Sequence, residues 1–83
     1  GAPRVDATAT TVAVTGSIRP VLAGAAVQLQ QQSGTVWTTV ASTVTDAAGA
    51  WNFAGTEPAG TYRVRCAPGQ GLAAGVSATL LVQ

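Results

Sequence analysis

Hydrophobic and polar residues alternate along most of this chain, which is the period-two pattern of half-buried β-strands. In residues 25–32, Val27 and Leu29 are expected to face a core, whereas the intervening glutamines are expected to face solvent. No stretch keeps the spacing of three and four residues that is typical of an amphipathic helix. The pattern therefore predicts an all-β protein.

Turn residues divide the chain into short segments at intervals of roughly eight to twelve residues. We expect strands at 10–18, 25–32, 36–45 (one long strand or two short ones), around Trp51 and Phe53, at 61–66, and at 75–82 with Val76, Ala78, Leu80 and Val82 on its core face. The connections are too short for parallel crossovers, so the strands should pair antiparallel. The prediction is an antiparallel β-sandwich of six or seven strands, immunoglobulin-like or prealbumin-like.

Length and composition limit the organisation to one domain. The 83 residues contain 47% hydrophobic and only 8% charged residues, which excludes charge-driven disorder. We assign residues 10–83 to a single sandwich and residues 1–9 to a linker or N-terminal extension of a longer polypeptide. An almost uncharged surface suits a module that is tethered to a larger protein, and we expect an extracellular or cell-surface location with any export signal upstream.

The charges exclude two classes of partner. Four arginines and three acidic residues are spread along the chain, the net charge is +1, and lysine is absent. A phosphate backbone requires clustered cations, and an anionic membrane attracts polybasic runs. No apolar stretch is long enough to cross a bilayer. Neither nucleic acid nor membrane insertion is expected.

Catalysis is not expected either, because histidine, the commonest general base and metal ligand, is absent. The three carboxylates, Asp6, Asp46 and Glu57, are too scattered for a glycosidase pair or a calcium site. Residues 69–74 match the dinucleotide fingerprint Gly-x-Gly-x-x-Ala, but β-patterned residues lie on both sides instead of a strand and a helix. We predict a non-enzyme with no cofactor and no metal.

The single cysteine, Cys66, cannot form an internal disulfide. It falls on the same face of strand 61–66 as Tyr62 and Val64, which favours a buried thiol. An exposed thiol that forms an intermolecular bridge is the alternative, and the sequence leaves it open.

Three residues are candidates for partner contact. Trp37 faces outward if Val36 and Val40 face inward, unless a β-bulge intervenes, so its exposure stays open. Arg63 and Arg65 project from the face opposite Tyr62, and two arginines at this spacing can bind a carboxylate, although a solvated sheet face has the same pattern.

Several motifs follow one another along the chain. Residues 23–30 read Ala-Gly-Ala-Ala-Val-Gln-Leu-Gln, residues 37–41 read Trp-Thr-Thr-Val-Ala, residues 45–53 read Thr-Asp-Ala-Ala-Gly-Ala-Trp-Asn-Phe, and residues 59–64 read Ala-Gly-Thr-Tyr-Arg-Val. Over residues 16–82 the chain resembles sandwich modules of bacterial extracellular proteins, of the carboxypeptidase-regulatory-like and collagen-adhesin B-type kind. The resemblance implies the fold more than a function. The lysine-dependent isopeptide bond of the collagen-adhesin relatives is excluded here, because the chain has no lysine.

These observations predict a non-catalytic accessory or spacer module of a larger secreted or cell-surface bacterial protein, with the neighbouring domains of that polypeptide as partners. One alternative is a subunit that self-assembles by strand pairing, with residues 4–15 donated to a neighbouring copy. The other is an adhesin module that binds carbohydrate or protein through Trp37 and the adjacent Thr and Gln surface.

Overall fold

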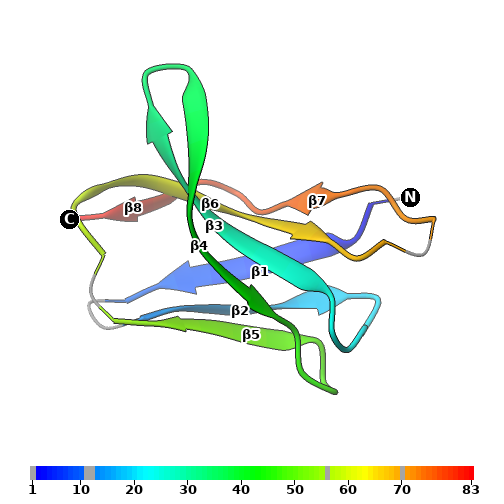
Figure 1. Ribbon diagram of the computed structural model, residues 1–83. Helices are drawn as coiled ribbons and strands as arrows, with labels where there is room; N and C mark the ends of the chain where they lie inside the picture. Colours follow the sequence, from blue (N-terminus) through cyan, green and yellow to red (C-terminus); the bar gives the residue numbers. More distant parts are fainter. Residues whose placement is uncertain (1, 11–12, 56, 70) are drawn as a thin grey trace.

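The computed structural model describes residues 2–10, 13–55, 57–69 and 71–83, and the described residues form eight strands in two antiparallel sheets (Figure 1). The three-stranded sheet has the order β1 (Arg4–Ala9), β2 (Ala13–Arg19), β5 (Ala50–Ala54). The five-stranded sheet has the order β4 (Val36–Val44), β3 (Ala26–Ser33), β6 (Gly60–Ala67), and then both β7 (Gly75–Val76) and β8 (Leu80–Val82) along β6. The predicted all-β antiparallel sandwich is confirmed, with eight strands instead of six or seven. Nowhere in the described ranges is there a helix with the length and apolarity to cross a membrane.

The core lies between the two sheets and is built by the alternation of each strand. Every second residue of β3 and β6 points inward, as the sequence predicts. The buried apolar residues are Val5, Val14, Ile18, Ala25, Val27, Leu29, Trp51, Phe53, Tyr62, Val64 and Cys66. On the opposite side of β3 and β6, no second layer is formed by the described residues (Figure 1).

Polar side chains fix the connection between β4 and β5. The carboxylate of Asp46 accepts hydrogen bonds from the backbone N–H of Ala48 at 2.8 Å and of Ala50 at 3.0 Å. The buried Thr45 hydroxyl accepts from the N–H of Ala25 at 2.9 Å and donates to the carbonyl of Leu22. Residues 46–49 therefore form a tight turn, closed by a 3.0 Å hydrogen bond from the Gly49 N–H to the Asp46 carbonyl, and Asp46 acts there as a turn residue.

Gly16 allows β1, β2 and β5 to approach one another closely. It pairs with Trp51 of β5, and a Cβ at this position would lie 2.6 Å from the Trp51 ring and would overlap the carbonyl oxygen of Asp6. The large indole ring therefore covers a position that has room only for a hydrogen atom.

The N-terminal residues differ from the prediction. Residues 1–9 were expected to be a linker, but Arg4–Ala9 forms β1, which pairs with β2 over its whole length. Val5 lies in the core at 7% exposure. The segment carries only one large apolar residue, so its alternation is weak in the sequence. Backbone pairing with β2 stabilises the strand where its own side chains contribute little.

The end of the chain also differs. The expected single strand over 75–82 is divided, because Ser77 turns inward and exchanges hydrogen bonds with Val64 through its backbone N–H (2.8 Å) and its hydroxyl (2.9 Å). Val76 consequently faces outward at 46% exposure, and Ala78 is exposed as well. The predicted inward direction of these two residues was wrong. Leu80 and Val82 pack against the core as expected.

Some predictions fall on residues outside the described ranges. Thr11 and Val12 belong to the strand expected at 10–18, Thr56 to the loop before β6, and Gln70 to the glycine-containing loop after it.

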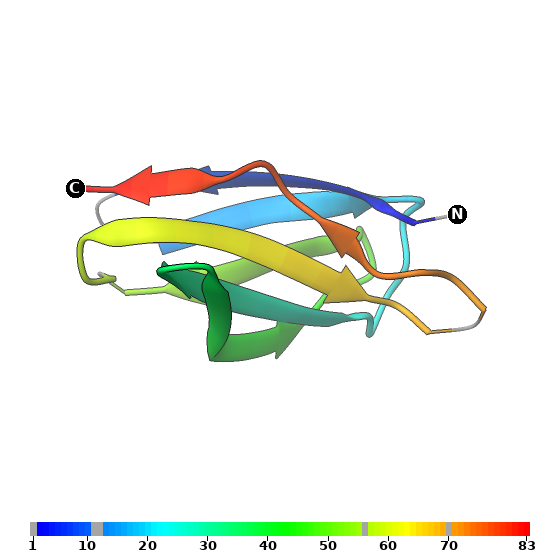
Figure 2. The ribbon, with the colours of Figure 1, turned by 90° about the horizontal axis from the view of Figure 1, so that it is seen from above.

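The two ends of the chain lie at opposite ends of the sandwich, which measures 34 × 26 × 16 Å along its principal axes (Figure 2). The β3–β4 hairpin extends beyond the rest of the molecule (Figure 1).

Candidate functional site

Strand β4 is irregular at its centre, which determines where its large side chains point. Its pairing with β3 shifts between Leu29 and Gln30, so that Val40 has no partner and is the extra residue of a β-bulge. Val36 and Val40 are both exposed, at 61% and 45%. Trp37 is half-buried on the outer side of the five-stranded sheet, which settles the exposure that the sequence left open.

Arg63 reaches across β3 and stacks on Trp37. The guanidinium carbon of Arg63 is 4.4 Å from the centroid of the Trp37 ring, the geometry of a cation–π contact. Arg63 Nε donates a 2.7 Å hydrogen bond to Oε1 of Gln30, a residue only 8% exposed. Gln30 Nε2 donates in turn to the Thr39 hydroxyl at 3.2 Å. Side chains from two neighbouring strands, β3 and β4, therefore hold the guanidinium group of Arg63 in place.

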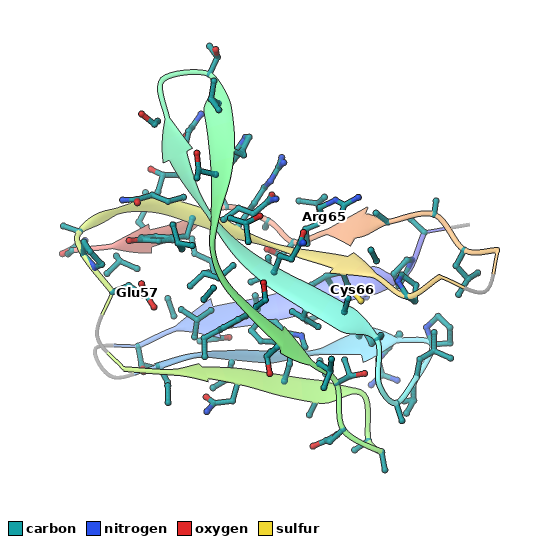
Figure 3. The ribbon with its side chains drawn as sticks, in the orientation of Figure 1. Glu57, Arg65 and Cys66 are labelled. Carbon is teal, nitrogen blue, oxygen red and sulfur yellow. The ribbon has the colours of Figure 1, made fainter. Side chains whose placement is uncertain are left out.

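Arg65 lies on the same side of the sheet, two residues further along β6. Its Nη1 donates to Oε1 of Gln28 at 3.3 Å. Figure 3 shows Arg65 on the outer side of β6 and Cys66 between the two sheets, as the alternation of the strand requires. We call Gln28, Gln30, Trp37, Thr39, Arg63 and Arg65 the outer-face cluster. All three contact residues proposed from the sequence belong to it.

The cluster is positively charged. Among the described residues, neither Arg63 nor Arg65 forms an ion pair, whereas Arg4 on the other sheet pairs with Asp6 at 3.2 Å. Glu57 precedes β6 and lies at the end of that strand away from Arg65 (Figure 3). The terminal nitrogens of Arg63 have no hydrogen-bond partner in the described part of the chain, so they are available to a ligand.

A second candidate is a depression of about 190 Å³ lined by Ala9, Thr10, Leu81, Val82 and Gln83. Small-molecule pockets usually measure about 300–1,000 Å³ and combine apolar walls with a few converging polar groups. The depression is smaller and carries no charged side chain, so the outer-face cluster is the better candidate site.

Cys66 is fully buried at 0% exposure between Val27 and the neighbouring core residues. The buried-thiol interpretation is confirmed, and the alternative of an exposed bridging thiol is wrong for this fold. Burial raises the pKa of the Cys66 thiol above its ordinary value. The pKa of Tyr62 is raised as well, first by burial and second by the negative charge of Glu57, while its hydroxyl donates to the carbonyl of Pro58 at 2.7 Å.

These two pKa shifts predict a loss of stability in alkaline solution. Both groups ionise at lower pH in the unfolded chain than in the folded protein, so unfolding releases protons once the pH passes their ordinary values, about 8.5 for Cys and 10 for Tyr. We expect the urea midpoint to be lower at about pH 10 than at about pH 7. Equal midpoints would contradict the assignment of Cys66 and Tyr62 as buried neutral groups.

The contact between Trp37 and Arg63 should be measurable as a coupling energy. In a double-mutant cycle with Trp37→Leu and Arg63→Gln, we expect an interaction of about 0.5–1 kcal/mol, the size of an exposed cation–π contact. The pair Trp37→Leu and Arg4→Gln is the control, because Arg4 lies on the other sheet, and its coupling should be near zero. Urea denaturation of the four variants in each cycle gives both values.

Sequence reasoning found the three large side chains of the cluster but not the residues that organise them. It predicted that Gln28 and Gln30 face outward and, in the adhesin alternative, a Thr and Gln surface beside Trp37, but not that Gln30 links Arg63 to Thr39. The strand order β4-β3-β6 brings these residues to Arg63 and Arg65, and alternation along single strands does not contain that order.

Comparisons with protein-family models, curated proteins and solved structures find no match for this chain. The class of protein is therefore defined by its own architecture, an antiparallel β-sandwich with an uncovered, arginine-bearing sheet face. The resemblance to bacterial extracellular modules stays a prediction.

Proposed function

We propose that this chain is a non-catalytic accessory module of a larger secreted or cell-surface protein, and that it contacts a carbohydrate or protein partner through the outer-face cluster. The observation that carries the proposal is the orientation of Arg63, which is held by Gln30 and stacked on Trp37 while its terminal nitrogens remain available.

An arginine that is held before a ligand arrives has an energetic advantage. A free arginine side chain loses about 2 kcal/mol of rotamer entropy when it is immobilised, and a pre-ordered one has already lost part of it. Tryptophan and arginine are also the residues that most often dominate binding energies at interfaces. Gln30 is buried, and both its amide oxygen and its amide nitrogen have hydrogen-bond partners, so its side chain is itself fixed. The cluster therefore combines a fixed cation with a half-exposed aromatic ring.

The two chain ends are far apart in the fold. They lie at opposite ends of the sandwich in both views (Figures 1 and 2). Domains attached to both ends would follow one another in series and leave the broad outer face uncovered. This arrangement suits an accessory or spacer module.

The test measures binding of the protein and of its Trp37→Ala variant to a panel of immobilised partners. The panel contains purified neutral and acidic polysaccharides and purified extracellular proteins. We expect at least one partner whose affinity falls by about tenfold or more in Trp37→Ala. Asn52→Ala is the control, because Asn52 is exposed on β5 of the other sheet, and it should bind normally. A panel without any binder, or a binder that ignores Trp37→Ala, would count against the proposal.

One observation favours a second candidate, self-assembly by strand pairing. The nine-residue strand β4 is an edge of the five-stranded sheet, carries no charged residue, and exposes Val36, Val40 and Val44. The version in which residues 4–15 are donated to another copy would require Arg4–Ala9 to leave the pairing with β2 that it forms here. Sedimentation of the protein and of its Val40→Lys variant tests whether copies assemble through the β4 edge. We expect both to be monomers at micromolar concentration. Oligomers of the unchanged protein that are absent in Val40→Lys would favour self-assembly instead.

A further inference from the structure

The outer face has its polar residues at the centre and its apolar residues at the margins. Gln28, Gln30, Arg63 and Arg65 belong to the two central strands, β3 and β6. Large apolar side chains that share this face lie on the outer strands: Val44 of β4, Val76 of β7 opposite Arg65, and Leu81 of β8 opposite Thr61. Protein interfaces usually have the reverse anatomy, with an apolar centre and a polar rim. The face therefore suits a hydrated, hydroxyl-rich ligand better than a folded protein.

The positive charge of the face indicates that the ligand is negatively charged. Arg63 and Arg65 are two residues apart on one strand, which separates their Cα atoms by about 6.7 Å. Among the described acidic residues, Asp6 pairs with Arg4, Asp46 bonds its own turn, and Glu57 lies at the end of β6 away from Arg65 (Figure 3), so none of the three pairs with Arg63 or Arg65. The amide oxygens of Gln28 and Gln30 accept from the two guanidinium groups without removing their charge. Two oriented cations are left without a carboxylate, and charge-assisted hydrogen bonds to carboxylates are the strongest contacts that arginine makes.

We propose that the outer-face cluster binds a carboxylate-bearing polysaccharide, a polymer of uronic acids. The inference rests on the proposed function and names the ligand class of the same site. Carboxylates on the polymer pair with Arg63 and Arg65, and its hydroxyl groups exchange hydrogen bonds with the amides of Gln28 and Gln32 and the Thr39 hydroxyl. The half-exposed ring of Trp37 offers an apolar surface for the C–H groups of a sugar.

The surface that surrounds the arginines favours an acidic polysaccharide over an acidic peptide. Three glutamines share this face, and each amide both donates and accepts hydrogen bonds, as sugar hydroxyls do. The depression described above lies at the ends of β1 and β8, away from the cluster, whose residues come from three adjacent strands. A ligand must lie across the strands, and a polymer with repeated carboxylates can do so.

The experiment uses one polymer in two charge states. Polygalacturonate and its methyl ester share a backbone and differ in the carboxylate charge, and poly-glutamate supplies carboxylates without sugar hydroxyls. Isothermal titration of the protein with each polymer should give binding to polygalacturonate, at least tenfold weaker binding to the methyl ester, and weaker binding to poly-glutamate.

Variants then locate the site. Arg63→Gln and Arg65→Gln should each weaken polygalacturonate binding by about tenfold, the size of one charge-assisted contact at an exposed site. Arg4→Gln removes the same charge from the other sheet and should leave the affinity within about twofold. Circular dichroism checks that all three variants are folded. An equal loss of affinity in Arg4→Gln would overturn the assignment of the site, since the polymer would then be attracted by the net charge of the protein and not by the cluster.

The remaining outcomes separate this inference from the proposed function. Equal affinity for polygalacturonate and its methyl ester would overturn the carboxylate preference but leave a carbohydrate-binding module. Equal or tighter binding of poly-glutamate would overturn the preference for a polysaccharide over an acidic peptide, and the module would then be a protein-binding one. No binding to any of the three polymers would overturn the inference, and the Trp37→Ala panel would still test the function independently.

Discussion

Replacing Trp51 with alanine should lower the free energy of unfolding by about 3–5 kcal/mol, the usual cost of removing a large buried aromatic side chain. Trp51 is 5% exposed, lies over Gly16 of β2, and has its ring centroid 5.6 Å from that of Phe53. A domain of this length has a total stability of about 4–12 kcal/mol. The expected loss is therefore a large fraction of the total stability, and urea denaturation of the variant measures it.

Trp37→Ala is the matched control, because it removes the same side chain from a half-buried position on the outer face. Its loss should be clearly smaller, about 1 kcal/mol, since the contact with Arg63 is exposed and no core cavity is left. If Trp37→Ala were the more damaging of the two, the assignment of the inner and outer sides of the sandwich would be wrong.

Deleting residues 1–9 should unfold the protein. The deletion removes all of β1, takes Val5 out of the core, and leaves β2, which carries Val14 and Ile18, as an edge strand paired only with β5. The remaining two-stranded β2–β5 pair would be marginally stable at best in water. We expect the far-ultraviolet circular dichroism spectrum to lose its strand signal and the thermal transition to lose its cooperativity.

Deleting only residues 1–2 is the control for this truncation. Ala2 is exposed and precedes the paired segment, so its loss should leave the melting temperature nearly unchanged. A cooperative melt in the longer truncation would show that Arg4–Ala9 is an extension, as the sequence alone suggests, and that β1 contributes nothing to the fold.

The strands that carry the core could be predicted because their side chains repeat the pattern of the sheet. Val27 and Leu29 of β3, Tyr62 and Val64 of β6, and Trp51 all face inward as the alternation requires. The turn at Asp46 could also be predicted, since a carboxylate in this position bonds the backbone two residues on. These features depend on residues that are close in sequence.

The features that escaped prediction depend on contacts between distant segments. Ser77 turns inward because it bonds Val64, thirteen residues earlier, and this reverses the direction of Val76. The bulge at Val40 changes the alternation of β4, and nothing in the local pattern marks it. The register determines which residues of two strands lie opposite each other. A shift of one residue moves every following side chain to the other face of the sheet.

The candidate site combines both kinds of information. Alternation predicts that Arg63 and Arg65 share a face, and it does so correctly. That Arg63 reaches Trp37 over Gln30 depends on the order β4-β3-β6 and on the bulge, neither of which a single strand reveals. The sequence therefore supplied the chemical groups, and the sheet brings them together.

Arg63 should be held in place on the outer face before any ligand binds. Nuclear magnetic resonance relaxation of the arginine Nε–H groups tests this, because the order parameter reports side-chain motion at each arginine. We expect an order parameter for Arg63 close to that of the rigid backbone, about 0.8, and a value below about 0.6 for the exposed Arg4. An Arg63 signal as mobile as that of Arg4 would contradict the claim.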